Sequence, residues 1–127
     1  MKKFTQEAFD ALPIVDGIRQ CPTGDYSGVN NFGHYCVFGN SCVFEGKHKA
    51  KPGYPLLSIA GAGSVNRTTY FFNTEDGIIV RSGCFKGTLQ EFRTRVRSET
   101  KPTDIKALQY LGFANIVAAT WAPELVD

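Results

Sequence analysis

The order of apolar and polar residues predicts a short N-terminal helix, a β-rich middle and a helical C-terminal third. Apolar residues recur at helical spacing from Phe4 to Leu12 behind a threonine cap, so a helix is expected over about residues 6–11. Residues of high β propensity, broken by turn residues, fill about 14–86, with a hairpin where 68–72 and 78–80 flank a turn. This segregated order is typical of an α+β protein, and one domain over residues 1–127 is expected.

The C-terminal third predicts helices over about 89–99, 103–111 and 113–121. Thr88 and Glu91 form the pattern of a capping box, in which each side chain satisfies a backbone amide of the other residue. Pro102 bars continuation of the first helix. The second is expected to bury Ile105, Leu108 and Leu111 and to end at Gly112.

The segment FGHYCVFGNSCVF, residues 32–44, repeats itself with a period of six. One interpretation is a coil of a left-handed β-helix, in which lines of six residues form successive sides. The other is a hairpin, in which residues 35–38 and 41–44 flank a Gly39-Asn40 turn. Both keep the alternation of a strand because six is an even number, so the spacing leaves both open.

Composition and charge limit the function classes. The chain has 127 residues, of which 43% are hydrophobic, and its net charge is +2, so a folded domain without a strong general affinity for polyanions is expected. The N-terminus has two lysines but no apolar run behind them, and no apolar stretch approaches the length of a membrane span. We therefore expect a protein of the host-cell cytoplasm with reduced cysteines and no membrane partner.

Two sets of residues suggest thiol or metal chemistry. Cys36, Cys42 and His48 share one register of successive six-residue lines, which would suit zinc, but no Cys-x-x-Cys knuckle accompanies them. Packing in the core is the preferred interpretation of these cysteines. Cys84 lies just before a helix N-terminus, where a thiol can become reactive.

Basic residues form the candidate binding set for a partner or an anion. They are Arg81, Lys86, Arg93, Arg95 and Arg97, together with Lys47, Lys49 and Lys51, which lie in an expected basic loop over residues 47–53. On a helical wheel Arg93 and Arg97 lie to one side of the apolar stripe and Arg95 to the other, so no single basic face is predicted there. Phosphate-loop, dinucleotide-binding and hydrolase motifs are absent from the sequence, so we expect neither a cofactor nor catalysis.

Three stretches resemble a group of short phage and prophage proteins. Residues 15–26 are similar to a VDG-x-x-QCPTGDY-like start, residues 32–43 to F-G-x-x-C-x repeats, and residues 81–92 to an RSGCF-x-GTL-x-EF segment. The resemblance spans roughly residues 8–97 and implies variable numbers of repeats, which favours the β-helix coil over the hairpin. It carries no established activity.

These observations together lead to an expected function. We expect a non-enzymatic phage accessory protein that binds and inhibits a host or anti-phage defence protein, with anti-CRISPR activity as the specific case. The alternative is a module that sequesters a nucleotide, or binds nucleic acid, through arginines that include Arg81, Arg93 and Arg97. Because one coil of a β-helix leaves an open edge, we also expect a homodimer or capping by the C-terminal helices.

Overall fold

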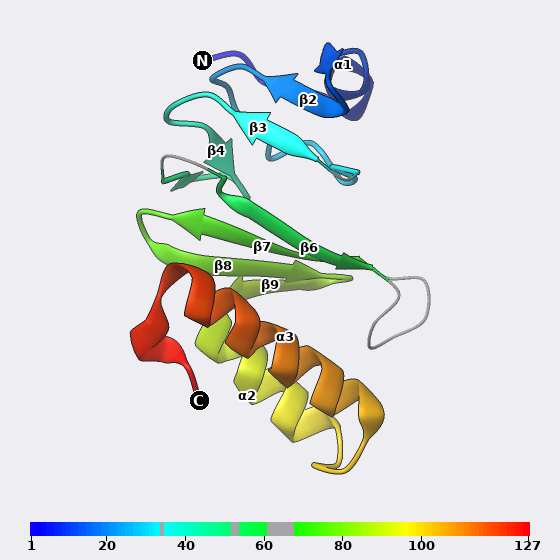
Figure 1. Cartoon of the computed structure of the whole chain (residues 1–127), viewed down its shortest axis with the longest axis vertical. Helices are drawn as coiled ribbons and strands as arrows, with labels where there is room; N and C mark the ends of the chain where they lie inside the picture. Colours follow the sequence, from blue (N-terminus) through cyan, green and yellow to red (C-terminus); the bar gives the residue numbers. More distant parts are fainter. Residues whose placement is uncertain (34, 52–53, 61–67) are drawn as a thin grey trace. The chain divides into compact units, whose positions relative to one another are not determined.

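The computed structural model describes the whole chain except residues 34, 52–53 and 61–67 (Figure 1). The protein is a small α+β protein, as the sequence predicted. Its elements are α1 (Gln6–Asp10), β1 (Ile14–Val15), β2 (Ile18–Cys21), β3 (Cys36–Phe38), β4 (Val43–Phe44), β5 (His48–Lys49), β6 (Leu56–Ala60), β7 (Thr68–Thr74), β8 (Gly77–Ser82), β9 (Phe85–Thr88), α2 (Leu89–Glu99), α3 (Ile105–Trp121) and a 3-10 turn (Pro123–Leu125).

Contacts between residues divide the chain into two compact units. The N-terminal unit comprises Met1–Leu56 and Phe72–Asp76, and the C-terminal unit comprises Leu57–Phe71 and Gly77–Asp127. Strand β7 therefore contributes residues to both units.

The N-terminal unit is built from parallel stacking of segments that are distant in the sequence. β2 pairs with β3 in parallel, with Arg19 opposite Cys36 and Cys21 opposite Phe38. At a second place, single parallel β-bridges join Lys3 to Asp25 and Asp25 to Val43. Successive passes of the chain thus lie on top of one another at two places.

This stacking contradicts the hairpin interpretation of residues 35–38 and 41–44. β3 lies in a sheet with β1 and β2, whereas β4 pairs antiparallel with β5, so the two six-residue lines are not partners. The turn types that suit a Gly39-Asn40 hairpin need a positive φ at glycine. Gly39 is not among the described residues with positive φ, and Ser41 has a φ of 60° instead.

Aromatic rings fill the interior of the N-terminal unit. The three phenylalanines of the six-residue period, Phe32, Phe38 and Phe44, are all buried. The centroid of the Phe44 ring lies 5.1 Å from that of Phe38 and 4.6 Å from that of Phe72. Such ring pairs stabilise a core beyond the area they bury, so the period of six is explained by packing.

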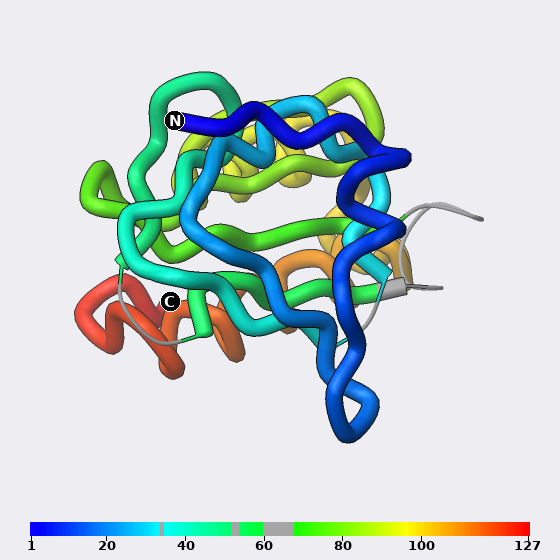
Figure 2. The backbone as a smooth tube through the Cα atoms, turned by 90° about the horizontal axis from the view of Figure 1, so that it is seen from above, coloured from blue at the N-terminus to red at the C-terminus, as the bar shows by residue number. Residues whose placement is uncertain are grey.

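At the start of the predicted β-rich region, residues 14–21 form a hairpin. β1 and β2 pair antiparallel around Asp16 and Gly17, which have φ values of 52° and 79° and so suit a tight turn. Figure 2 shows this hairpin as a blue loop that extends from the rest of its unit. Ile14 and Val15 are 59% and 54% exposed on it.

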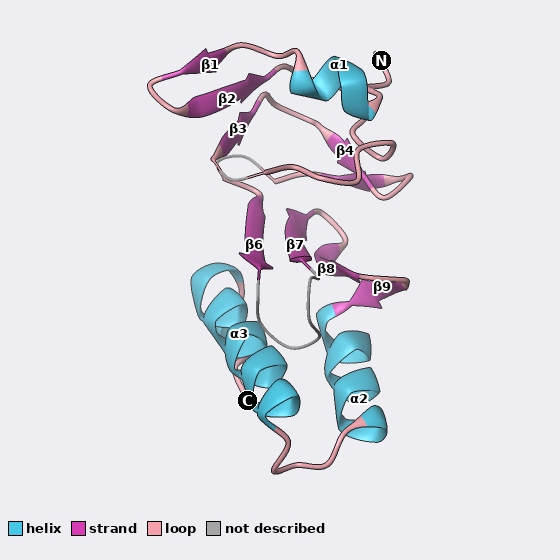
Figure 3. Ribbon diagram, turned by 90° about the vertical axis from the view of Figure 1, so that its right-hand side faces the viewer, coloured by secondary structure: helices cyan, strands magenta, loops and turns pink. Residues whose placement is uncertain are grey.

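The C-terminal unit packs two helices against strands. The four-stranded sheet has the order β6-β7-β8-β9, and the predicted hairpin of residues 68–72 and 78–80 is confirmed as β7 and β8. The sequence did not predict β9, which pairs antiparallel with β8. α2 and α3 run side by side (Figure 3), and the rings of Phe92 and Tyr110 lie 5.5 Å apart between them.

Both predicted N-terminal caps are confirmed. The Thr5 side chain accepts a hydrogen bond from the Ala8 amide at the start of α1. At α2 the capping box forms in both directions between Thr88 and Glu91, with hydrogen bonds of 3.1 and 2.9 Å. The Thr88 amide holds the pKa of the Glu91 carboxyl below its usual range.

The prediction of two helices over 103–111 and 113–121 is wrong, because α3 continues through Gly112. Its buried residues lie on both sides of the glycine, and their burial outweighs the cost of about 1 kcal/mol for glycine in a helix. The expected buried face is also wrong in part. Ile105 and Leu108 are exposed, while Ala107 is buried in their place.

Two further expectations concern membranes and loops. Within the described ranges, no helix combines the length and the apolar character needed to cross a bilayer. The sequence also predicts a glycine-rich loop over residues 61–64, which lie outside the described residues. Of the basic loop 47–53, the part that is described includes strand β5.

Candidate functional site

Three exposed lysines alternate along residues 47–51, with Lys49 in strand β5, Lys47 in the turn before it and Lys51 just after it. Lys47, Lys49 and Lys51 are exposed, while His48 is half-buried and Ala50 is buried between them. This is the alternation of an extended strand, which places successive outward side chains roughly 7 Å apart. We call these three residues the lysine row.

Hydrogen bonds on both sides fix the backbone of the lysine row. The Ala50 amide donates to the Cys42 carbonyl at 2.7 Å on one side. On the other side the Lys51 amide donates to Asn73 at 2.9 Å, and the Glu75 amide donates to Lys49 at 2.8 Å. The backbone of the row is therefore held from Lys49 to Lys51, which limits the order that this part must gain on binding.

The ammonium groups of the lysine row are available for a partner. Among the described residues, none of the three lysines forms an ion pair with an acidic side chain. His48 instead pairs with Asp76, with 2.9 Å between Nδ1 and Oδ2. Tyr54, three residues beyond the row, is 66% exposed.

The arginines and Lys86 of the C-terminal unit do not form a comparable surface. Arg81 is buried, with its guanidinium 4.8 Å from the centroid of the Tyr70 ring. Arg95 is exposed but pairs with Glu99 at 2.5 Å. Lys86 is exposed on β9.

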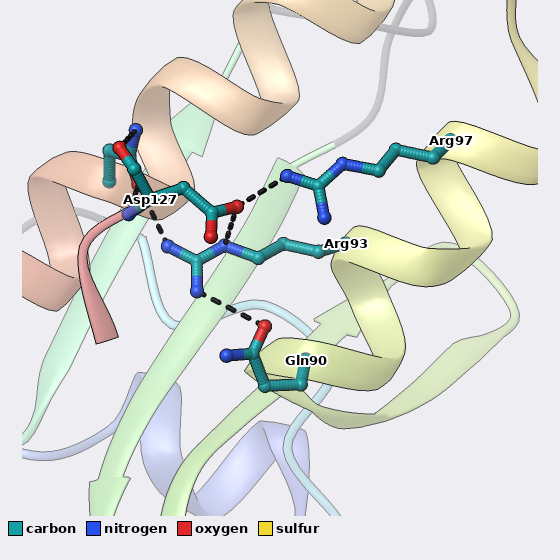
Figure 4. A network of polar contacts seen from close by, with 5 residues as sticks. Gln90, Arg93, Arg97 and Asp127 are labelled. Atoms are coloured by element: carbon teal, nitrogen blue, oxygen red, sulfur yellow. Dashed lines mark hydrogen bonds and ion pairs between the residues drawn. The ribbon is translucent and has the colours of Figure 1, made fainter. Parts of the chain in front are cut away.

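Arg93 and Arg97 converge on the C-terminal residue (Figure 4). Arg93 is 1% exposed; its Nη2 donates to Asn115 Oδ1 at 2.8 Å, and its Nε lies 3.5 Å from Asp127 Oδ2. Arg97 hydrogen bonds the same carboxylate oxygen. This bond is the main reason why the pKa of the Asp127 carboxyl lies below its ordinary value. The two arginines thus tie the C-terminus to α2.

The wheel-based prediction that Arg93 and Arg97 share one side of α2 is consistent with this arrangement. Their partner could not be predicted, because Asp127 lies 30 residues from Arg97 in the sequence and outside any periodic pattern. Arg93 is a structural residue at the interior of the unit rather than a surface contact.

The four cysteines are free thiols in three environments. Cys21 and Cys42 are buried, Cys36 is half-buried and Cys84 is exposed. A hydrogen bond to Cys36, together with burial, raises the pKa of Cys21. The same hydrogen bond lowers the pKa of Cys36, so Cys36 is the more acidic thiol of the pair. The parallel register of β2 and β3 brings this pair together, and nothing in the sequence spacing indicates it.

The metal site suggested by Cys36, Cys42 and His48 does not form. No group of three or more potential ligands is arranged for a metal ion in the part of the chain that the structure describes. His48 is bound to Asp76, and the Cys42 thiol donates to the Gly39 carbonyl at 3.1 Å. His34, the other histidine, lies outside the described residues.

Cys84 is one of the residues that line a small pocket in the C-terminal unit. The pocket has a volume of about 160 Å³. Its lining includes Phe85, Arg95, Lys106 and Tyr110. Pockets that bury drug-sized ligands usually occupy about 300–1,000 Å³, so this one suits a smaller group.

Comparison with protein-family models, with curated proteins and with solved structures finds no match for this chain.

Proposed function

We propose that this chain is a non-enzymatic phage accessory protein that binds and inhibits a host or anti-phage defence protein in the host-cell cytoplasm. A CRISPR effector is the specific target class that we favour. The observation that carries the proposal is the lysine row: Lys49 lies in β5, Lys47 and Lys51 lie beside it, and the three ammonium groups form no ion pair with any residue that the structure describes. The resemblance of residues 8–97 to phage and prophage proteins supports the biological setting.

An acidic protein surface is the partner that this chemistry favours. Exposed charges of one sign accelerate encounter with a surface of the opposite sign and exclude like-charged partners. The exposed Tyr54 adds the type of aromatic residue that is enriched at the centre of protein interfaces. The net charge of +2 is low for a protein that binds nucleic acid through its general field.

The non-enzymatic part of the proposal has its own support. His48, the one histidine that the structure describes, pairs with Asp76 through Nδ1 and has no hydrogen bond to a thiol or hydroxyl group in the described part of the chain. Nucleophilic catalysis by a cysteine usually requires such a base next to the thiol.

One observation supports the alternative function, in which the protein binds and sequesters a nucleotide. Arg95 and Lys106 line the 160 Å³ pocket together with the rings of Phe85 and Tyr110. However, Arg81 and Arg93, two of the arginines expected to hold a nucleotide, are buried, and Arg97 is bound to Asp127. A thermal-shift screen with cyclic and linear nucleotides tests this alternative, because a ligand of the native state raises the Tm.

We also propose that the N-terminal unit is a short β-helix coil. The parallel steps from Arg19 to Cys36 and from Asp25 to Val43 support it, since each is close to the length of the three six-residue lines that make one coil. Insertion of one further coil, again three six-residue lines, after Val43 is expected to leave a folded protein, whereas insertion of half a coil is expected to unfold it. Equal loss of folding in both variants, measured by circular dichroism, would exclude the coil.

Expression of the protein in host strains that carry individual defence systems tests the inhibitor proposal. We expect a restored efficiency of plating for a challenged phage in at least one strain, most directly one with a CRISPR system. The variant K47E/K49E/K51E is expected to lose this effect. K2E/K3E/K101E is the matched control, since it changes the net charge equally at exposed lysines outside the row. Full defence in every strain contradicts the proposal, as does equal activity of the two variants.

A further inference from the structure

The pocket that Cys84 lines in the C-terminal unit has an aromatic wall. The ring centroid of Phe92 lies 5.6 Å from that of Phe85 and 5.5 Å from that of Tyr110, and all three side chains line the pocket. Phe92 is buried, but Phe85 and Tyr110 are half-buried and so keep part of their surface exposed. A flat apolar group that enters the pocket covers this surface and can meet the rings in the geometries that aromatic pairs favour.

Two cationic side chains also line the pocket and have donors to spare. Arg95 holds Glu99 Oε1 at 2.5 Å through Nε, and its guanidinium carbon lies 5.9 Å from the centroid of the Phe85 ring. Its two Nη groups form no hydrogen bond with any residue that the structure describes. The Lys106 ammonium is exposed and likewise has no ion pair within the described ranges.

The charge of the lining favours an anion. Arg95 and Lys106 against Glu99 leave a net charge of +1, and Arg95 already binds one oxygen of the Glu99 carboxylate. The fork of an arginine matches the two oxygens of a carboxylate, and charge-assisted hydrogen bonds of this kind are the stronger ones. The volume of about 160 Å³ suits a group of the size of one ring rather than a drug-sized ligand.

We propose that this pocket binds a small aromatic carboxylate, with its ring against Phe85 and Tyr110 and its carboxylate at Arg95 and Lys106. The inference goes beyond the inhibitor function, because the pocket belongs to the C-terminal unit and shares no residue with the lysine row. It also differs from the nucleotide alternative, since a nucleotide adds a sugar and a phosphate to its base and exceeds this volume.

The few contacts available to such a ligand predict weak binding. The affinity that small ligands reach per non-hydrogen atom corresponds to a Kd of about 1 mM for a molecule of the size of benzoate. Binding therefore needs a readout that responds at millimolar ligand concentration and reports on this pocket alone.

The thiol of Cys84 provides that readout, because it is exposed and lines the pocket. Benzoate at about 10 mM is expected to slow the alkylation of Cys84 by iodoacetamide about 10-fold, as mass action requires for a Kd of about 1 mM. Mass spectrometry of the peptides measures the rate. Cys36, half-buried in the N-terminal unit, is the internal control, and its rate is expected to stay unchanged. Unchanged alkylation of Cys84, or equal slowing at both cysteines, overturns the proposal.

Two further compounds separate the ring from the charge. Acetate has the carboxylate without the ring, and benzylamine has the ring with the opposite charge. At the same concentration each is expected to slow the alkylation of Cys84 less than about 2-fold. Protection by either compound as strong as that by benzoate contradicts the proposed pairing of ring and carboxylate. Stronger protection by adenosine monophosphate than by benzoate overturns the proposal in favour of the nucleotide alternative.

A substitution in the pocket tests the position of the carboxylate. Lys106→Gln removes one cation and is expected to raise the Kd for benzoate at least about 3-fold, while circular dichroism stays unchanged because the side chain is exposed. Lys3→Gln, at an exposed lysine outside the pocket, changes the net charge equally and should bind benzoate like the wild type. Because each Kd comes from the ratio of rates with and without benzoate, a changed reactivity of the thiol does not affect it. Equal Kd values for the two variants overturn the assigned contact.

Discussion

Replacement of Gly39 by alanine tests the parallel stacking of the N-terminal unit. A Cβ at this position would lie 2.8 Å from the Thr23 amide nitrogen and 3.0 Å from the Thr23 hydroxyl oxygen. The Gly39 amide also donates to the Cys21 carbonyl at 2.7 Å, so the two passes of chain are held against each other at this point. The added methyl group can be accommodated only if one pass moves away.

Two opposing effects set the size of the expected change. Overpacking of a tight contact costs about 1–3 kcal/mol. The alanine also reduces the freedom of the unfolded chain, which stabilises the native state by about 0.4–1 kcal/mol. The two effects leave a net loss of about 0–2.6 kcal/mol in the free energy of unfolding, and the upper part of this range, about 1–2.6 kcal/mol, is expected for Gly39→Ala because the nearest atom is a backbone nitrogen that cannot rotate away.

Gly112→Ala is the matched control, because the same substitution meets no atom within 4 Å there. It is expected to raise the free energy of unfolding by up to about 1 kcal/mol through helix propensity. Urea unfolding of the two variants at low micromolar concentration, with equal m-values, measures both changes. A Gly39→Ala variant as stable as the wild type, or more stable, would refute the stacking of β3 on β2 at this point.

Two further predictions concern the core and the C-terminus. Phe44→Ala is expected to cost about 3–5 kcal/mol, because the ring is fully buried among other rings; a urea midpoint close to that of the exposed-site variant Tyr54→Ala would contradict this packing. Because the pKa of Asp127 is lowered in the folded state, its ion pair contributes stability above about pH 4 that is lost as the pH falls through the lower, folded-state value. Asp127→Asn should therefore show a smaller loss of stability between pH 5 and acid than the wild type, and an identical profile would show that the C-terminal contact contributes nothing.

Local signals predicted the parts of the fold that depend on neighbouring residues. The capping box of α2 lies within four consecutive residues, so the sequence alone placed its first residue correctly. The turn before Gly77 and the strands on both sides of it were also predicted from local residue types. In each case the energies that decide the structure act over a few positions.

α3 shows where local rules fail. Gly112 and the preceding apolar residues predicted a helix end, but the buried face continues past the glycine and offsets its cost. Because this helix is apolar on two sides, periodicity could not identify which side is covered, and Ile105 and Leu108 were assigned to the wrong one. The packing of α3 against α2 and the strands decides which side of α3 is covered, and the sequence of α3 alone does not contain this information.

The stacking of the N-terminal unit and the candidate site likewise depend on contacts between residues that are distant in the sequence, so local signals did not predict them. Partners as far apart in the sequence as Arg19 and Cys36 leave no local signal, so spacing alone does not reveal that residues 35–38 and 41–44 are not hairpin partners. The lysine row was predicted as a loop, although the alternation of lysine with His48 and Ala50 is that of a strand. The burial of Arg93 could not be predicted from the sequence, because it depends on contacts with Asn115 and Asp127, which are distant in the chain.

The central claim is that the lysine row binds an acidic protein surface of a defence component. The most direct measurement is the Kd for the effector identified by the plating assay, determined at several salt concentrations for the wild type, K47E/K49E/K51E and K2E/K3E/K101E. We predict that the row variant binds at least about 100-fold more weakly, that the control variant binds like the wild type, and that salt weakens only the wild type and the control. Equal Kd values for the row and control variants, or tight binding to nucleic acid in place of the effector, would contradict the claim.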